Sequence, residues 1–175
     1  MPLLKNNTLV PETWLHTSAD GELPAGDVVV PFARLLKEWE QLSKRPGKLG
    51  VSLGNVDRAE ALAMFLPKLQ LIELPFPAFN DGRAYSIARQ LRQMGYRGEL
   101  RATGNVLPDQ LQFMLQVGFD TFDIGERFTL ATWQQASKLM SLAYQRGLYR
   151  RNDEAEIWTE RHTDAEPWLE QPHAG

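Results

Sequence analysis

An alternation of short apolar runs with amphipathic stretches constrains the fold of this chain more than any other feature. The runs are DVVV, KLGVSL, LQLIEL, ELRAT and FDTFDI, and they begin near residues 28, 49, 70, 99 and 120. A strand-helix unit therefore recurs about every 21 residues, with one longer interval. Such alternation implies right-handed crossovers and a mainly parallel sheet, so the sequence predicts an α/β fold.

The stretches between these runs have helical periodicity and end at residues that stop helices. Gly95 and Gly118 stand where two of the helices should end, because glycine readily adopts the left-handed backbone of a helix C-terminus. Glu60 lies three residues after Asp57, as in a capping box. We expect helices after Pro31, Asp57, Arg83 and Pro108, and a last helix from Leu130 to about Gly147.

Two architectures fit this pattern: an open sheet with helices on both faces, or a partial TIM-like βα barrel with strands in sequential order. The length of 175 residues and the hydrophobic content of 43% suit one compact domain. We expect a peripheral strand and turn at 1–26, a single α/β domain at 27–147 and a polar tail at 148–175. The tail is either mobile or docked through Trp158 and Trp168.

Charge and composition exclude several classes of function. The net charge of −3 provides no broad positive field, so the chain is not expected to bind nucleic acid. The start of the chain lacks the pattern of a secretory signal, and no apolar run has membrane-spanning length, so we expect a cytoplasmic protein without membrane contact.

The sequence shows no motif for a cofactor. There is no cysteine, which excludes disulfides, thiol catalysis and thiolate metal sites, so any redox chemistry needs a borrowed cofactor. His16, His162 and His173 lie far apart, so we expect solvated imidazoles and no metal site. Neither a GxGxxG nor a Walker sequence is present.

Three polar loops follow expected strands, at the sheet edge where ligands of parallel α/β folds gather. Arg83 offers a planar pair of donors to an oxyanion, and Thr103 and Asn105 offer further hydrogen bonds. The alternative is ordinary turn and capping chemistry, with Arg83 paired to Asp81. The candidate residues for binding an anion or a partner are Asn80, Asp81, Gly82, Arg83, Arg101, Thr103, Gly104 and Asn105, with Gly54-Asn55-Val56-Asp57 as the third loop.

Charged residues also interrupt the apolar runs. Glu73, Arg101 and Asp123 lie inside expected strands, and buried charges are seldom unpaired, so we expect an internal network among them. The network is either a structural salt bridge or part of an acid-base site. No catalytic residue can be assigned from the sequence alone.

Three segments carry a resemblance to a known family: FPAFNDGRAYSIARQLR, GYRGELRATGNVLPDQL and VGFDTFDI. They resemble a bacterial domain-of-unknown-function family described as a probable oxidoreductase involved in sulfite reduction. The resemblance covers roughly residues 8 to 147. Ala84 stands where the family has glycine, and Asn105 where an aspartate is usual. The matching positions are Phe76, Pro77, Phe79, Asp81, Gly82, Arg83, Ser86, Arg89, Arg101, Gly104, Asp109 and Gln110.

The resemblance implies an accessory role in assimilatory sulfite reduction, and so in making sulfide for cysteine biosynthesis. Such a protein would dock on sulfite reductase or bind its oxyanion substrate. One alternative is a small α/β enzyme that acts on an anionic or phosphorylated metabolite through Arg83, Arg101, Asp81 and Asp123. Another is a scaffold in which the DGR loop only caps a helix.

Overall fold

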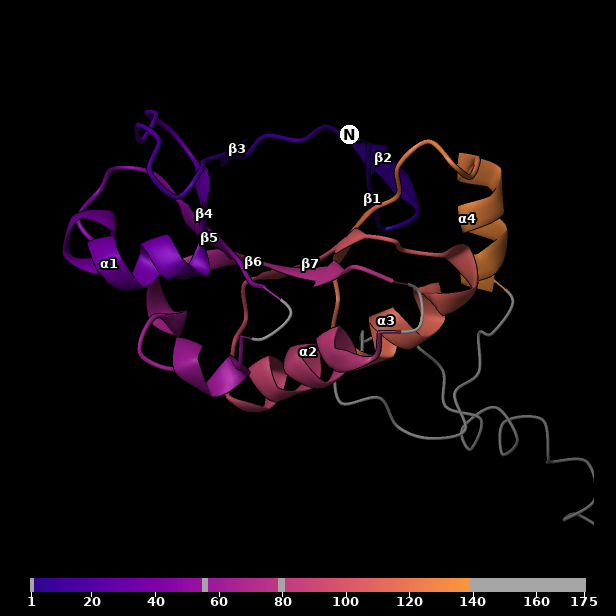
Figure 1. Ribbon diagram of the computed structural model, residues 1–175. Coiled ribbons are helices and arrows are strands. Elements are labelled where there is room, and N and C mark those ends of the chain that lie inside the picture. The colour runs from indigo at the N-terminus through magenta and orange to yellow at the C-terminus, as the bar shows by residue number, and fades with distance from the viewer. Residues whose placement is uncertain (1, 55–56, 79–80, 139–175) are drawn as a thin grey trace, which may run out of the picture.

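The computed structural model describes residues 2–54, 57–78 and 81–138, which form a mixed α/β domain around one curled sheet. Figure 1 shows the sheet as a half-barrel with helices on its convex side. The strand order is β2-β1-β8-β7-β6-β5-β4-β3. The strands are β1 (Leu3–Lys5), β2 (Thr8–Val10), β3 (Leu15–His16), β4 (Val28–Pro31), β5 (Leu49–Ser52), β6 (Leu69–Phe76), β7 (Glu99–Gly104) and β8 (Thr121–Asp123).

The strands from β3 to β8 are parallel and follow one another in sequence order. Within the described sheet, the antiparallel pairings are those that β1 makes with β8 and with the edge strand β2. The mainly parallel sheet predicted from the alternation is therefore confirmed, and each of the five apolar runs contains a strand. Sequential strand order is expected for a partial βα barrel, the second of the two architectures considered above.

The N-terminal segment belongs to both edges of the sheet. Strand β2 ends at Val10 on one edge and β3 begins at Leu15 on the other. Eight flat strands would separate these edges by about 34 Å, whereas the five Cα steps from Val10 to Leu15 reach at most about 19 Å. The sheet must therefore curl, and Figure 1 shows the segment crossing its open side.

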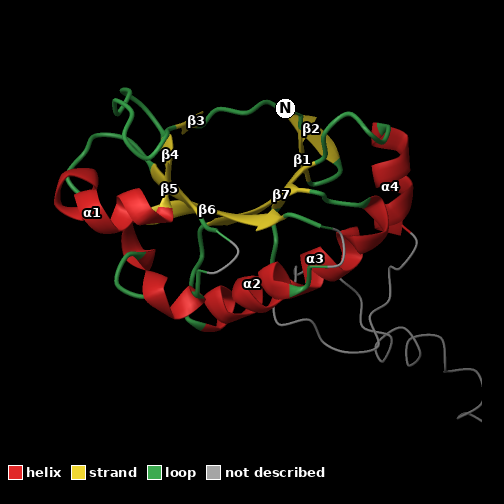
Figure 2. Ribbon diagram, viewed as in Figure 1, coloured by secondary structure: helices red, strands yellow, loops and turns green. Residues whose placement is uncertain are grey.

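Helices cover the convex face, as the secondary-structure colours of Figure 2 show. Gly118 ends α3 in the left-handed conformation, with φ of 107°, as its position in the sequence predicted. The described part of the predicted last helix is α4, and residues 139–147 and the tail at 148–175 lie outside the described residues. The α-helices are α1 (Phe32–Leu42), α2 (Arg83–Gln93), α3 (Leu111–Val117) and α4 (Leu130–Lys138), and a short 3-10 turn, η3 (Pro108–Gln110), precedes α3.

The predicted α-helix after Asp57 is wrong. Two 3-10 turns, η1 (Ala59–Leu62) and η2 (Leu66–Lys68), occupy this stretch. Pro67 lacks the N–H that an α-helix would need there, and the Asp57 carboxylate accepts a hydrogen bond from the Gly54 N–H. The capping residue is thus used to close its own loop.

Alternation along β6 places apolar residues on the convex face and a charged residue on the concave face. In β6, Ile72 and Leu74 belong to the core that packs under the helices, while Glu73 between them lines the concave side. Trp133 from α4 is fully buried in the same core. Among the described helices, none has the combination of length and apolar character that crossing a bilayer requires.

A charged pocket on the concave face

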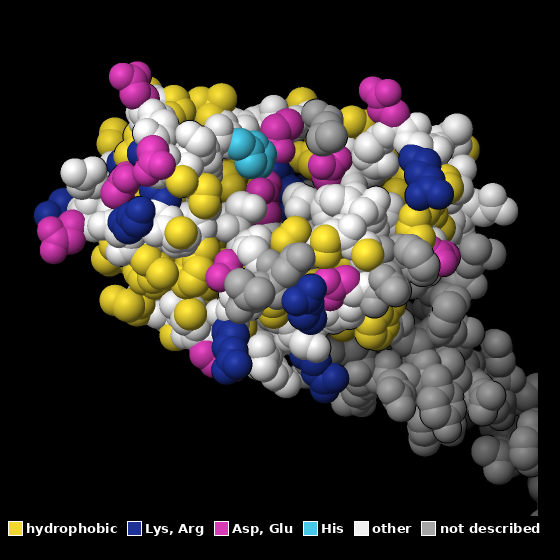
Figure 3. Space-filling view, viewed as in Figure 1, with side chains coloured by type: hydrophobic (Ala, Val, Ile, Leu, Met, Phe, Trp, Pro, Cys, Tyr) yellow, Lys and Arg dark blue, Asp and Glu magenta, His cyan; other side chains and the backbone are white. Residues whose placement is uncertain are grey.

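The concave face of the sheet holds a pocket of about 370 Å³. Figure 3 shows this side of the molecule, with a histidine beside several acidic side chains. The lining combines the N-terminal segment with β6, β7 and β8, which the curl of the sheet brings together. Its polar lining residues are Glu12, His16, Glu73, Arg101, Thr103 and Asp123.

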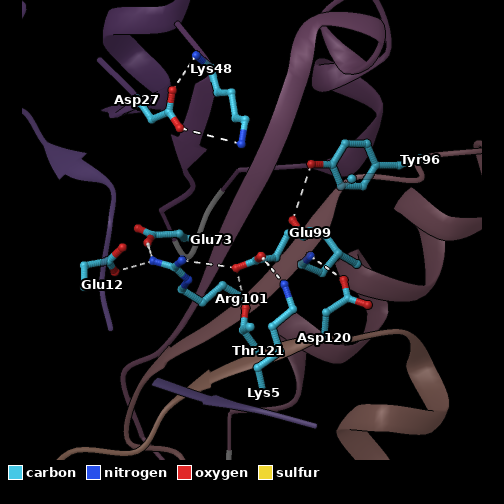
Figure 4. A network of polar contacts seen from close by, with 12 residues as sticks. Lys5, Glu12, Asp27, Lys48, Glu73, Tyr96, Glu99, Arg101, Asp120 and Thr121 are labelled. Atoms are coloured by element: carbon cyan, nitrogen blue, oxygen red, sulfur yellow. Dashed lines mark hydrogen bonds and ion pairs between the residues drawn. The ribbon is translucent and has the colours of Figure 1, made fainter. Parts of the chain in front are cut away.

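Arg101 is the buried centre of the pocket, with only 2% of the residue exposed. Its Nη1 donates to Glu12 Oε2 at 2.5 Å and to Glu73 Oε1 at 3.2 Å, and its Nη2 donates to Glu99 Oε1 at 3.1 Å (Figure 4). The register explains two of these contacts, because Arg101 lies opposite Glu73 on β6 and two residues after Glu99 on its own strand. Buried Arg101 Nε has no hydrogen-bond partner among the described residues.

His16 reaches the same cluster from the edge strand β3. Its Nε2 lies 2.9 Å from Glu73 Oε1, and half of the imidazole is exposed while Glu73 is almost fully buried. The hydrogen bond to Glu73 raises the pKa of His16 above its ordinary value. The sequence analysis treated the three histidines as solvated, whereas this one is held by a buried carboxylate.

Glu99 extends the cluster toward β1 and β8. It accepts hydrogen bonds from Lys5 Nζ at 2.9 Å and from Thr121 Oγ1 at 2.7 Å. Burial raises the pKa of Glu99, but the hydrogen bonds from Lys5 and Thr121 and the nearby charge of Arg101 outweigh it, so this pKa is lowered. Glu99 therefore remains a charged partner of Arg101.

The predicted network of Glu73, Arg101 and Asp123 is present only in part. The Glu73–Arg101 pair exists, but no ion pair joins Asp123 to Arg101 in the described structure. Arg101 lies opposite Thr121, so Asp123 is two residues further along β8, where its Oδ1 accepts a hydrogen bond from the Gly125 N–H. Its place in the network is taken by Glu12 and Glu99.

The DGR loop lies apart from this pocket, at the start of α2. Asp81 accepts from the Arg83 N–H at 3.1 Å, and Arg83 Nε and Nη2 donate to the same carboxylate at 2.9 and 2.6 Å. Arg83 lowers the pKa of Asp81 from its ordinary value to about 2, mainly through this side-chain hydrogen bond. Gly82 precedes the helix without a side-chain cap, and Asn80 lies outside the described residues. The pairing considered as the alternative in the sequence analysis is the one observed.

The remaining candidate loop is divided between two places. Thr103 lines the concave pocket, whereas the Asn105 side chain donates to Pro77 O at 2.6 Å and the Asn105 N–H to Phe76 O at 2.7 Å. Asn105 thus ties the ends of β6 and β7 together. Gly54, Asp81 and Arg83 border a second hollow of only about 10 Å³. The predicted anion-site residues that the structure describes are therefore not gathered into one site.

Gly104 is required by the backbone at the end of β7. Its φ is 88°, and a Cβ atom added there would lie 2.6 Å from Phe76 O. Gly104→Ala is expected to lower the free energy of unfolding by about 2 kcal/mol, because it adds left-handed strain to a contact with rigid backbone. Urea unfolding measures the change, and Gly82→Ala, where no atom lies within 4 Å of the added Cβ, is the matched control. Equal stability of the two variants would contradict this account.

Sequence reasoning missed Glu12, His16 and Glu99 as members of the cluster. The two-residue period of a strand carries the signal for Glu99, since Glu99 and Arg101 share one face of ELRAT. No comparable signal connects Glu12 or His16 to Glu73, because both lie in a segment without regular periodicity. Only the pairing of β3 at the sheet edge brings them close.

The fold and the site together define a small α/β half-barrel protein with a charged pocket on its concave face. Residues 50–154, which are 105 of the 175 in the chain, match the family model of the bacterial proteins of unknown function DUF934. The chain belongs to this family. Neither a curated protein nor a solved structure matches the sequence significantly.

Proposed function

We propose that the protein is an accessory component of assimilatory sulfite reduction and acts by docking on sulfite reductase. The pathway rests on the resemblance of the DGR, RATG and FDTFDI segments described above. A chain without cysteine offers no thiol for electron transfer, which favours a role beside the reductase over a reduction carried out by this chain's own side chains.

The ion pairs of Arg101 and Arg83 favour docking on the reductase over binding of sulfite. Arg101 is surrounded by Glu12, Glu73 and Glu99, so the concave pocket already contains more carboxylates than cations. Arg83 has two of its donor nitrogens on Asp81. Neither guanidinium therefore presents the unpaired fork that binds a small oxyanion tightly.

The Asp81–Arg83 pair is nevertheless suited to a protein partner. The Arg83 side chain is 57% exposed, and its Nη1 donates no hydrogen bond to a described residue. Asp81 holds the guanidinium in place before binding, so less side-chain entropy is lost when Nη1 meets an acidic group. We assign this pair to the contact with the reductase.

Arg83→Ala is expected to leave the fold unchanged, to weaken binding to sulfite reductase about tenfold and to impair growth on sulfite. A deletion strain carrying each variant is grown on sulfate, sulfite, sulfide and cysteine, and binding is measured by calorimetry. Arg58→Ala, another exposed arginine, is the control. Rescue by sulfide but not by sulfite places the protein at the reduction step. Normal growth on sulfite and unchanged binding of Arg83→Ala would refute the docking role.

The pocket supports a second candidate function, a small α/β enzyme. A half-exposed imidazole oriented by a buried carboxylate, as in His16 and Glu73, is a common arrangement for a general base. The surrounding carboxylates favour a neutral or cationic substrate over an anionic one. Saturable binding of sulfite or a phosphate ester would favour the enzyme with an anionic substrate, whereas binding to the reductase alone favours the docking protein.

A further inference from the structure

Three side chains in the concave pocket have the chemistry and spacing of metal ligands. Glu12 and His16 come from the N-terminal segment and Glu73 from β6. Each offers one ligand atom, and the three atoms lie within 4.8 Å of one another. Imidazole nitrogen and carboxylate oxygen are ordinary zinc ligands, and tetrahedral coordination would bring the atoms to about 3.3 Å apart. His16 is half exposed and Glu12 is part-buried, so metal binding would require these side chains to shift toward Glu73.

One of the three is a buried ligand with an unused oxygen. Glu73 is 3% exposed and lines the pocket. Its Oε1 contacts His16 and Arg101, but its Oε2 accepts no hydrogen bond from any described residue. This oxygen is not among the fully buried atoms that lack a partner, so it faces the open space of the pocket, where it is available to a cation.

The net charge around the pocket also favours a bound cation. Four carboxylates line or border it, from Glu12, Glu73, Glu99 and Asp123, against at most three cations: Arg101, the more exposed Lys5 and His16 in its protonated form. The balance is therefore negative before any ligand enters. A divalent cation would offset it where a further anion would not.

We propose that the concave pocket binds one Zn²⁺ ion through Glu12, His16 and Glu73, with a fourth position open toward the pocket. Arg101 donates hydrogen bonds to the Glu12 and Glu73 carboxylates and would orient them toward the ion. Residues that hydrogen-bond to metal ligands commonly have this role. The sequence analysis expected no metal site because the histidines are far apart, but this site uses only one of them. The inference is independent of the proposed docking role, which concerns the loop after β6 and the start of α2.

The test measures Zn²⁺ binding to the full chain by calorimetry, and Co²⁺ binding by its visible absorption. His162→Ala/His173→Ala serves as the reference protein, because it removes the two other imidazoles of the chain. We expect this reference to bind one ion per chain with a dissociation constant tighter than about 10 µM. His16→Gln and Glu73→Gln in the same background should each weaken binding at least tenfold.

Two controls separate loss of the site from loss of the fold. His16→Gln changes a half-exposed side chain and keeps a hydrogen-bond donor for Glu73, so its circular dichroism should match that of the reference. Glu40→Gln removes an exposed carboxylate on α1 and should bind as the reference does. The proposal is overturned if the reference shows no saturable binding, or if a folded His16→Gln protein binds Zn²⁺ and Co²⁺ with unchanged affinity.

Discussion

Arg101→Ala is expected to lower the free energy of unfolding by about 3 to 5 kcal/mol, because it breaks a buried ion-pair cluster. The substitution leaves Glu73 buried with no guanidinium beside it and removes a partner of Glu12 and Glu99 as well. These carboxylates would then repel one another across a poorly solvated pocket. Urea unfolding followed by circular dichroism measures the change.

A double-mutant cycle isolates the Arg101–Glu73 interaction. Glu73→Ala should lower the free energy of unfolding less in the Arg101→Ala background than in the wild-type protein. In that background the Glu73 carboxylate has already lost its Arg101 partner. Arg83→Ala, which breaks a pair at the surface, should change the unfolding midpoint very little. Equal midpoints for Arg101→Ala and Arg83→Ala would show that the cluster does not hold the fold together.

The second large effect is expected at Arg92, on the buried side of α2. Its guanidinium donates to Gly118 O, to Tyr96 O and to Asp120 Oδ2, with only 2% of the side chain exposed. Arg92→Ala leaves these acceptors without this donor beneath the loops that precede β7 and β8. We expect a loss of about 2 to 4 kcal/mol.

Arg89→Ala is the matched control for Arg92, since it removes an arginine from the exposed face of the same helix. Helix propensity changes in the same direction in both variants, so their difference reports the buried contacts. The unfolding midpoint in urea gives that difference. Similar midpoints for the two variants would contradict the role of Arg92 as a buried tie between loops.

The strands could be predicted because their signal is local. LQLIEL is bounded, apolar and long enough for a strand, and it became β6 with Ile72 and Leu74 on the core side. The α-helix predicted after Asp57 rested on the helical spacing of its apolar residues. Pro67 and the hydrogen bond between Asp57 and Gly54 limit this stretch to 3-10 turns. Local backbone chemistry outweighed periodicity there.

The site could be predicted only where it lies within the regular strands. Glu73 and Arg101 were recognisable as charges inside apolar runs, and the register places them opposite each other. Glu12 and His16 were not, because their positions depend on the edge to which the N-terminal segment is joined. Asp123 was assigned to the wrong partner because the sequence does not specify the register between β7 and β8.

The split of the N-terminal segment between both edges of the sheet also determines the order in which the chain can fold. Leu4 pairs with Phe122, so β1 has no neighbour on that side until 118 further residues have been synthesised. Leu4 is almost fully buried in the finished protein, so this segment keeps apolar surface exposed until β8 has been synthesised. Contacts this distant in sequence slow folding, which makes closure of the half-barrel by its own N-terminus a late event.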